Sequence, residues 1–207
     1  MATALTIYNG ALAHLGEQAL TTTSDAVDRR RKLDAVYDKA KAWCLESGFW
    51  NFAIRSVEST PDAPTPEFYY AYQYTKPSDW VRTAAISASE SYDPPLNDFM
   101  DITGTWLSNV NPMYVQYVSN HATAGGGLLS AWPASYEEFV SGYLAQLACM
   151  SITQDKGLYD RLKMTIVPDL RKSALSRDAM NGPSKRFPVG TWVRARGNDI
   201  GRRYDRG

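Results

Sequence analysis

Hydrophobic positions near the N-terminus recur at helical spacing. Between residues 3 and 15 the apolar side chains follow one another at spacings of three, one, three, one and three, and they are Ala4, Ile7, Tyr8, Ala11, Leu12 and Leu15. Such spacing places them on one face of a helix. Gly16 follows as a candidate C-cap, because glycine readily adopts the left-handed backbone that often ends a helix. The pattern predicts a short amphipathic helix over residues 3–15.

A second helical pattern covers residues 24–47. Ser24 is a candidate N-cap, and Asp25 and Asp28 fall in the first turn, where negative charge suits the helix dipole. The expected buried face comprises Leu33, Val36, Tyr37, Ala40, Trp43, Cys44 and Ser47, and Gly48 ends the run. The opposite face mixes arginine, lysine and aspartate, which we interpret as a solvated surface.

The middle of the chain changes character. Seven prolines lie between residues 61 and 112, and no long helix tolerates them. Runs rich in β-branched and aromatic residues predict strands over residues 53–59, 68–74, 80–87, 99–102 and 113–119. In the segment FYYAYQY, Phe68, Tyr70, Tyr72 and Tyr74 share one face. That side can pack on a core while the other meets solvent or a neighbouring chain.

Helical spacing returns over residues 135–153, with an apolar surface broad enough to be buried on more than one side. Residues 158–180 continue it at intervals of four, and Pro168 predicts a kink or break. We therefore expect an α+β fold: a bundle of about four helices with an antiparallel β region over residues 53–119 inserted. Residues 1–180 form one domain in this interpretation, and residues 181–207 form an extended C-terminal arm.

The C-terminal arm differs from the rest of the chain in its net charge. The whole chain has 22 basic and 22 acidic residues, so it lacks the positive field that non-specific nucleic-acid binding needs. Residues 181–207 alone have seven basic and two acidic residues, a net charge of +5. Their few apolar side chains cannot bury enough surface to fold alone. The N-terminus lacks a signal-peptide pattern and no stretch is apolar enough for a membrane span, so we expect a soluble, unexported protein without membrane contact.

Residues that could support catalysis are sparse. Cys44 and Cys149 are expected to be buried free thiols, with one tertiary bridge as the alternative. His14 fits helix packing, and His121 has no neighbours at metal-ligand or nucleophile-base spacing. The glycines at 125–127 lack the Lys-Ser or Lys-Thr of a phosphate loop and are interpreted as a hinge. The pairs Asp98 with Asp101 and Glu137 with Glu138 have structural explanations, so we expect no enzyme activity, cofactor or metal.

Several short motifs occur in an order that resembles the head-to-tail adaptor (connector) family of tailed phages, the tail tubular protein A type of podophages. They are ALAHLGEQAL at 11–20, SDAVDRRRKLDAVYDKAKAWCLESGFWNFAIR at 24–55, YAYQYTKPSDWVR at 70–82, and the helix start formed by Trp132, Pro133 and Tyr136 with LAQLA after it. Each motif is a short structural signature. Their shared order across most of the chain carries the resemblance.

The resemblance implies a structural protein of the virion, assembled in the host cytoplasm. About twelve copies would form a homo-oligomeric ring between the portal and the tail nozzle or tail tube, joined by unlike surfaces, and DNA would pass through it without sequence specificity. The motif residues would form a structural junction, and they are Trp50, Phe52, Pro77, Asp79, Arg82 and Trp132. Trp50 and Phe52 would attach the long helix to the sheet. Pro77 and Asp79 would form a turn, with Arg82 placed to pair with Asp79.

The arm is the expected docking element for portal or a neighbouring copy. Aromatic anchors lie in it among arginines suited to carboxylates, and the candidates are Phe187, Trp192, Arg194, Arg196, Arg202, Arg203 and Tyr204. A solvated tail and a lining of the DNA channel remain alternatives. Two other function classes also stay open: a non-viral binding module that uses the aromatic strands, and a hydrolase whose site the motifs do not reveal.

Overall fold

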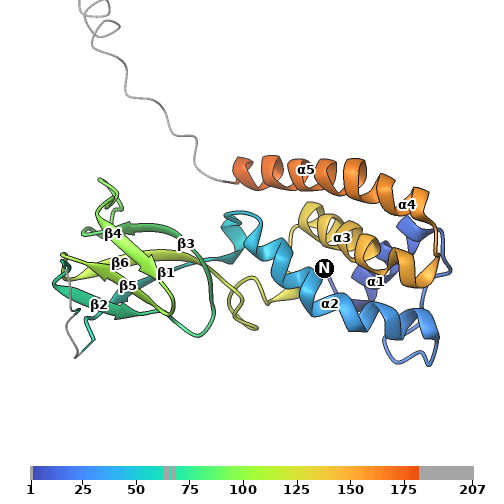
Figure 1. Cartoon of the computed structure of the whole chain (residues 1–207), viewed down its shortest axis with the longest axis horizontal. Helices are drawn as coiled ribbons and strands as arrows, with labels where there is room; N and C mark the ends of the chain where they lie inside the picture. Colours follow the sequence, from blue (N-terminus) through green and yellow to red (C-terminus); the bar gives the residue numbers. More distant parts are fainter. Residues whose placement is uncertain (1, 63–65, 67–68, 182–207) are drawn as a thin grey trace, which may run out of the picture.

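The computed structural model describes residues 2–62, 66 and 69–181, which form two lobes side by side along the long axis (Figure 1). One lobe is helical, and the other holds two three-stranded antiparallel sheets. The expected α+β class is therefore confirmed. The chain leaves the helical lobe after α2 and returns to it before α3, so the sheets are an insertion within the bundle.

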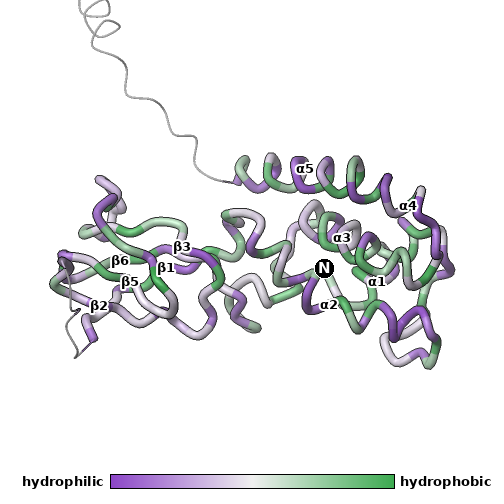
Figure 2. The backbone as a smooth tube through the Cα atoms, viewed as in Figure 1, coloured by the Kyte–Doolittle hydropathy of each residue, from purple (hydrophilic) through white to green (hydrophobic). Residues whose placement is uncertain are grey.

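Helix α3 (Ala134–Ile152) is the centre of the helical lobe. It contacts α1 (Ala4–Leu15), α2 (Asp28–Glu46) and α5 (Val167–Met180). Its buried side chains surround much of its circumference, as the broad apolar pattern predicted, and they include Tyr136, Phe139, Val140, Leu144 and Cys149. In contrast, α5 alternates hydrophilic and hydrophobic residues along its length because only one of its faces is covered (Figure 2).

The ends of α1 follow local chemistry closely. Thr3 is the N-cap, and its hydroxyl accepts a hydrogen bond from the Thr6 amide while the Thr6 hydroxyl accepts one from the Thr3 amide. Gly16 ends the helix with φ of 72°. Only glycine adopts that backbone without steric cost. The helix expected over residues 3–15 is thus confirmed.

Helix α2 starts later than the sequence predicted. Asp25 accepts hydrogen bonds from the amides of Thr21 and Thr22, so its side chain stabilises a turn before the helix instead of the first helical turn. The helix begins at Asp28, with Val27 as an N-cap that makes no side-chain bond. Trp43, expected on the buried face, is 40% exposed.

The helix predicted over residues 158–180 is three joined segments. Helix α4 (Lys156–Arg161) begins at the Asp155 N-cap, and a π-helical stretch η3 (Leu162–Ile166) leads into α5. Pro168 lies in the first turn of α5, so its missing N–H falls beside the π stretch, which changes the hydrogen-bond register. At the predicted kink or break the chain therefore changes from α-helical to π-helical hydrogen bonding, and it continues as a helix.

The β lobe contains six strands in two sheets. One sheet has the order β1 (Ile54–Ser59), β6 (Met113–Ser119), β3 (Trp80–Ser87), and the other β2 (Tyr72–Thr75), β5 (Thr105–Ser108), β4 (Phe99–Ile102). Strand β5 was missed by the sequence analysis, although the two-residue loop with Gly104 at φ of 79° signals a β4–β5 hairpin. Strand β2 is also shorter and later than the predicted 68–74.

Side chains from both sheets make the core of the β lobe. Its buried members are Tyr74, Ile86, Trp106, Met113, Val115 and Tyr117. A separate cluster fills the helical lobe. The chain passes between the lobes twice: through η1 (Asn51–Ala53), and through the segment after β6 that includes η2 (Leu129–Ala131). Within the described ranges, no helix combines the length and apolarity needed to cross a membrane.

Candidate functional site: the junction between the lobes and its exposed groove

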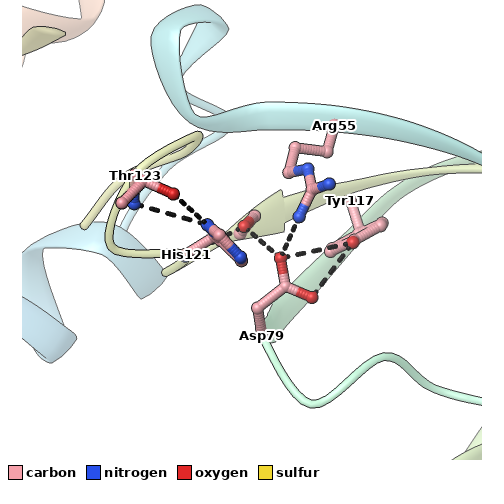
Figure 3. Close-up of polar contacts among 6 residues, drawn as sticks. Arg55, Asp79, Tyr117, His121 and Thr123 are labelled. Carbon is pink, nitrogen blue, oxygen red and sulfur yellow. Dashed lines mark hydrogen bonds and ion pairs between the residues drawn. The ribbon is translucent and has the colours of Figure 1, made fainter. Parts of the chain in front are cut away.

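Asp79 is the centre of a hydrogen-bond network at the junction (Figure 3). Its carboxylate accepts bonds from Arg55 Nη1 at 2.7 Å, Tyr117 Oη at 3.1 Å and Ser119 Oγ at 2.5 Å. Partial burial raises the pKa of Asp79, but the bonds from Ser119, Arg55 and Tyr117 outweigh it and leave the pKa below its ordinary value. A carboxylate so stabilised in its charged form is a poor general acid and a good structural anchor.

Two features of this network follow from backbone geometry. Asp79 lies in the turn that begins at Pro77, whose carbonyl accepts from the Trp80 amide at 3.0 Å. The Asp79 carbonyl accepts from the Asn120 amide at 2.9 Å, which ties the turn to the chain leaving β6. His121 takes part only in local contacts, since its Nδ1 accepts from the Thr123 amide at 3.3 Å.

Arg82 does not pair with Asp79, so that prediction was wrong. The two side chains are separated because β3 carries Arg82 towards the end of α2. There Arg82 Nη1 donates to the Glu46 carbonyl at 3.2 Å, and its guanidinium lies over the Phe49 ring at 4.3 Å. Arg171 of α5 donates to the neighbouring Ser47 carbonyl at 2.6 Å. Two arginines from distant parts of the chain thus cap the C-terminus of α2, where cations are favoured.

Trp50 and Phe52 pack on α3, whereas the sequence analysis placed them against the sheet. Trp50 is fully buried; its ring lies 4.8 Å from the Tyr136 ring, and its Nε1 donates to the Cys44 carbonyl at 3.0 Å. Phe52 is half-buried, and its ring centroid also lies 4.8 Å from that of Tyr136. Trp132 is buried and packs edge-on against the same ring at 4.8 Å. Tyr136 is therefore the common contact of all three aromatic motif residues.

The glycines at 125–127 are part of this packed region, which corrects their interpretation as a hinge. The Gly126 amide donates to the Ser119 carbonyl at 2.8 Å, and the Gly126 carbonyl accepts from Trp132 Nε1 at 2.8 Å. A methyl group at Gly126 would lie 2.4 Å from Leu45 Cδ2. Glycine is needed at this position because the Leu45 side chain, the Ser119 carbonyl and Ala53 Cβ leave no room for a side chain.

The remaining candidates for chemistry have structural partners. His14 Nε2 lies 3.0 Å from Glu138 Oε1, and Glu137 accepts a bond from Thr6, so both carboxylates connect α3 to α1. Asp101 binds Lys76 within the β lobe. Cys44 and Cys149 are buried free thiols, as expected, and burial raises the pKa of Cys44. Among the described residues, no three His, Cys, Asp or Glu side chains are grouped to hold a metal ion.

An exposed groove of about 900 Å³ lies beside the capped end of α2. Trp43 and Tyr143 are stacked on its wall, with ring centroids 4.0 Å apart and an interplanar angle of 16°. Lys163 and Lys172 add positive charge to the lining, together with the two capping arginines. The sequence does not reveal this groove, because Trp43 falls on the apolar side of the helical repeat and its exposure depends on where α5 lies.

A second exposed surface lies on the β lobe. Tyr69, Met100 and Ile102 are 80%, 48% and 40% exposed, and they border a hollow of about 450 Å³. Met100 and Ile102 come from β4, and Tyr69 precedes β2. Exposed apolar side chains gathered in this way are typical of protein contact surfaces. The two surfaces differ in chemistry, one cationic and aromatic, the other apolar.

The predicted docking residues all lie outside the described ranges, and they are Phe187, Trp192, Arg194, Arg196, Arg202, Arg203 and Tyr204. The described part of the chain ends at Asn181, directly after α5. A scan against protein-family models gave no match for this chain, and a search of curated proteins also found no matching relative.

Proposed function

We propose that this chain is a structural head-to-tail adaptor of a tailed bacteriophage, a subunit of a ring between portal and tail through which DNA passes. The proposal starts from the motif order described above. The observation that carries the proposal is that the motif segments, although distant in sequence, meet at one junction. Trp50 and Trp132 meet at Tyr136, and Arg82 caps the helix that precedes Trp50. The motifs therefore act together as one structural unit.

The exposed surfaces support ring assembly. A closed ring of identical subunits with head-to-tail contacts requires two different patches on each subunit. The cationic groove around Trp43 and Tyr143 belongs to the helical lobe, and the apolar surface of Tyr69, Met100 and Ile102 belongs to the β lobe. Aromatic residues and arginine are enriched where protein interfaces bury surface. Unlike patches on opposite lobes suit contacts that repeat around an axis.

The polar groups of the junction support a mechanical role. Asp79 is held in its charged form by three donors, and Arg82 and Arg171 are occupied by helix carbonyls. Arg82 joins the two lobes directly, because it lies on β3 and binds the Glu46 carbonyl at the end of α2. Asp79 orders the β side of the junction, and Arg171 orders the helical side. A ring subunit under load from packaged DNA needs such a connection, and it needs no acid-base chemistry.

Native mass measurement of the chain mixed with purified portal tests the proposal. We expect a complex with about twelve copies per portal assembly. Trp43→Ala should reduce assembly because the groove loses its aromatic wall, and Met150→Ala, also at an exposed position on the helical lobe, is the matched control. A complex with a single copy per portal, or none at all, contradicts the proposal.

A binding module of another origin is the second candidate. The hollow beside Tyr69 favours it, since clefts with apolar walls and aromatic side chains commonly bind peptides or glycans. This alternative predicts a monomer with portal present or absent. The same mass measurement therefore separates the two functions.

A further inference from the structure

Charge is separated between two parts of this chain. Residues 53–119, which include the β lobe, have eight acidic and three basic residues, a net charge of −5. Residues 181–207 have a net charge of +5, and the rest of the chain is balanced. The negative charge that offsets the C-terminal segment is thus concentrated in one lobe. Opposite charges separated in this way favour association between the two parts.

The three basic residues of the β lobe are already engaged. Arg55 pairs with Asp79, Lys76 pairs with Asp101, and Arg82 binds the Glu46 carbonyl. These contacts neutralise two carboxylates near the junction and inside the lobe. Among the described residues, Glu58 and Glu90 form no ion pair with a basic side chain, and both are exposed. They supply negative potential on the outer surface.

Glu58 and Glu90 line the same groove, of about 420 Å³, on the outer face of β1 and β6. Glu58 is opposite Tyr114 in the β1–β6 register, and the next pair, Val57 with Val115, belongs to the inner side. Alternation along both strands therefore places Glu58 and Tyr114 outward. Glu90 reaches the groove from the turn after β3.

Aromatic rings complete the groove. Tyr92 and Tyr114 line it beside the two carboxylates, and its described lining has no basic side chain. Partial desolvation and the charges of Glu58 and Glu90 raise the pKa of Tyr114, as a locally negative surface requires. Carboxylates beside aromatic rings suit arginine, which forms paired hydrogen bonds with the former and stacks on the latter.

We propose that this acidic groove binds the basic C-terminal segment, residues 182–207, of a neighbouring copy. The inference rests on the proposed function in one respect, because it assumes that copies of the chain meet. The segment has 26 residues and begins two positions after Met180, the last residue of α5, and an extended chain of that length reaches at most about 90 Å. That reach is ample for an adjacent subunit. The segment and the groove are unlike surfaces, as a head-to-tail contact requires.

Cross-linking of the full chain provides a direct test. Lys185 is the one lysine in residues 181–207, and a carbodiimide joins amines to carboxylates in contact. Equal amounts of unlabelled and ¹⁵N-labelled protein are mixed and treated, and cross-linked peptides are identified by mass spectrometry. We expect Lys185 joined to Glu58 or Glu90 with one labelled and one unlabelled partner, at a yield that falls with salt.

Charge reversal gives a second test with internal controls. The groove variant combines Glu58→Arg and Glu90→Arg, and the segment variant combines Arg194→Glu and Arg196→Glu. Each alone should reduce association between copies by about tenfold or more, measured by sedimentation, because like charges then meet. A mixture of the two should regain association, since each supplies the partner that the other lost. Glu17→Arg with Asp160→Arg, exposed positions outside the groove, is the matched control for charge.

The outcomes are distinct. Rescue in the mixture and mixed-isotope cross-links support the exchange of segments between copies. Two results would show that the segment binds the groove of its own chain, and they overturn the inference. They are cross-links that join only peptides of the same isotope, and association that is regained only when the groove and segment substitutions are in the same chain. Absence of these cross-links also overturns it. Failure of the proposed function is seen separately, because the cross-link and the rescue are measured without portal.

Discussion

Asp79 and Arg55 form an ion pair with 2.7 Å between Oδ2 and Nη1, and this pair joins the turn before β3 to the edge strand β1. Strand β1 starts directly after η1, the segment that follows Trp50. The pair therefore holds β1 in the β lobe close to the point where the chain arrives from the aromatic packing of the helical lobe. Arg82, only three positions further along the chain, binds the end of α2 instead.

Replacing Asp79 by asparagine should lower the free energy of unfolding by about 1–3 kcal/mol at pH 7, because charged hydrogen bonds to three donors are lost. The folded-state pKa is below the ordinary value, so this stabilisation is complete above about pH 4 and is lost as pH falls through the folded pKa. Urea unfolding of parent and variant should show a smaller difference in the free energy of unfolding at about pH 3 than at pH 7. A constant difference contradicts the assignment.

We expect the contribution of Asp178 to the free energy of unfolding to depend on pH in the opposite direction. Asp178 is 5% exposed. Its Oδ2 accepts a hydrogen bond from the Asn51 amide at 2.8 Å, whereas its Oδ1 is buried without a hydrogen-bond partner. Burial raises its pKa, so the charged form destabilises the fold at pH above the folded pKa. Asp178→Asn retains an acceptor for Asn51 and should be slightly more stable than the parent at pH 7. Below about pH 4 the gain should vanish, and a clear loss at pH 7 contradicts this account.

Trp50→Ala should destabilise the chain by about 3–5 kcal/mol, since a large, fully buried ring is removed. Phe52→Ala should cost less, about 1–3 kcal/mol, because its ring is half-buried. Thermal melting measures both. Met180→Ala is the control: its side chain is 77% exposed, and its removal should leave melting near that of the parent. Parent-like melting of both junction variants would show that these residues act in assembly and not in folding.

Gly126→Ala should lower the free energy of unfolding by about 1–3 kcal/mol, because the added methyl group overlaps Leu45 and approaches the Ser119 carbonyl at 2.8 Å. Gly157→Ala in α4 is the control, since the nearest atom there is the Asp155 carboxylate at 3.3 Å. Alanine favours the helix at that position by up to about 1 kcal/mol. Equal effects of the two substitutions would indicate that residues 125–127 are not tightly packed.

Deleting residues 183–207 should leave a folded subunit that no longer joins portal-filled heads. The described core of both lobes ends before this segment, so melting should change little. Head attachment is measured by counting tailed particles. Trp192→Ala should weaken attachment through lost burial, and replacing the arginines by glutamine should make it less sensitive to salt. Normal attachment after the full deletion would mean that the segment is not a docking element.

The sequence by itself determined the helices and most strands. Spacing on α1, its threonine cap and Gly16 act within a few residues, so local rules suffice for it. The clustered prolines likewise predict that no helix continues through residues 61–112. The motif order and the charge of the C-terminal segment are also features of the sequence alone.

Tertiary structure decided the partners. Asp79 binds Arg55, 24 positions away, while the nearer Arg82 is directed elsewhere by the path of β3. Trp43 is exposed because the position of α5 leaves a groove beside it, and Gly126 is packed because Leu45 meets it from a distant helix. Spacing along a chain predicts which face a side chain occupies. Which residue meets that face depends on packing between elements far apart in sequence, and periodicity contains no such information.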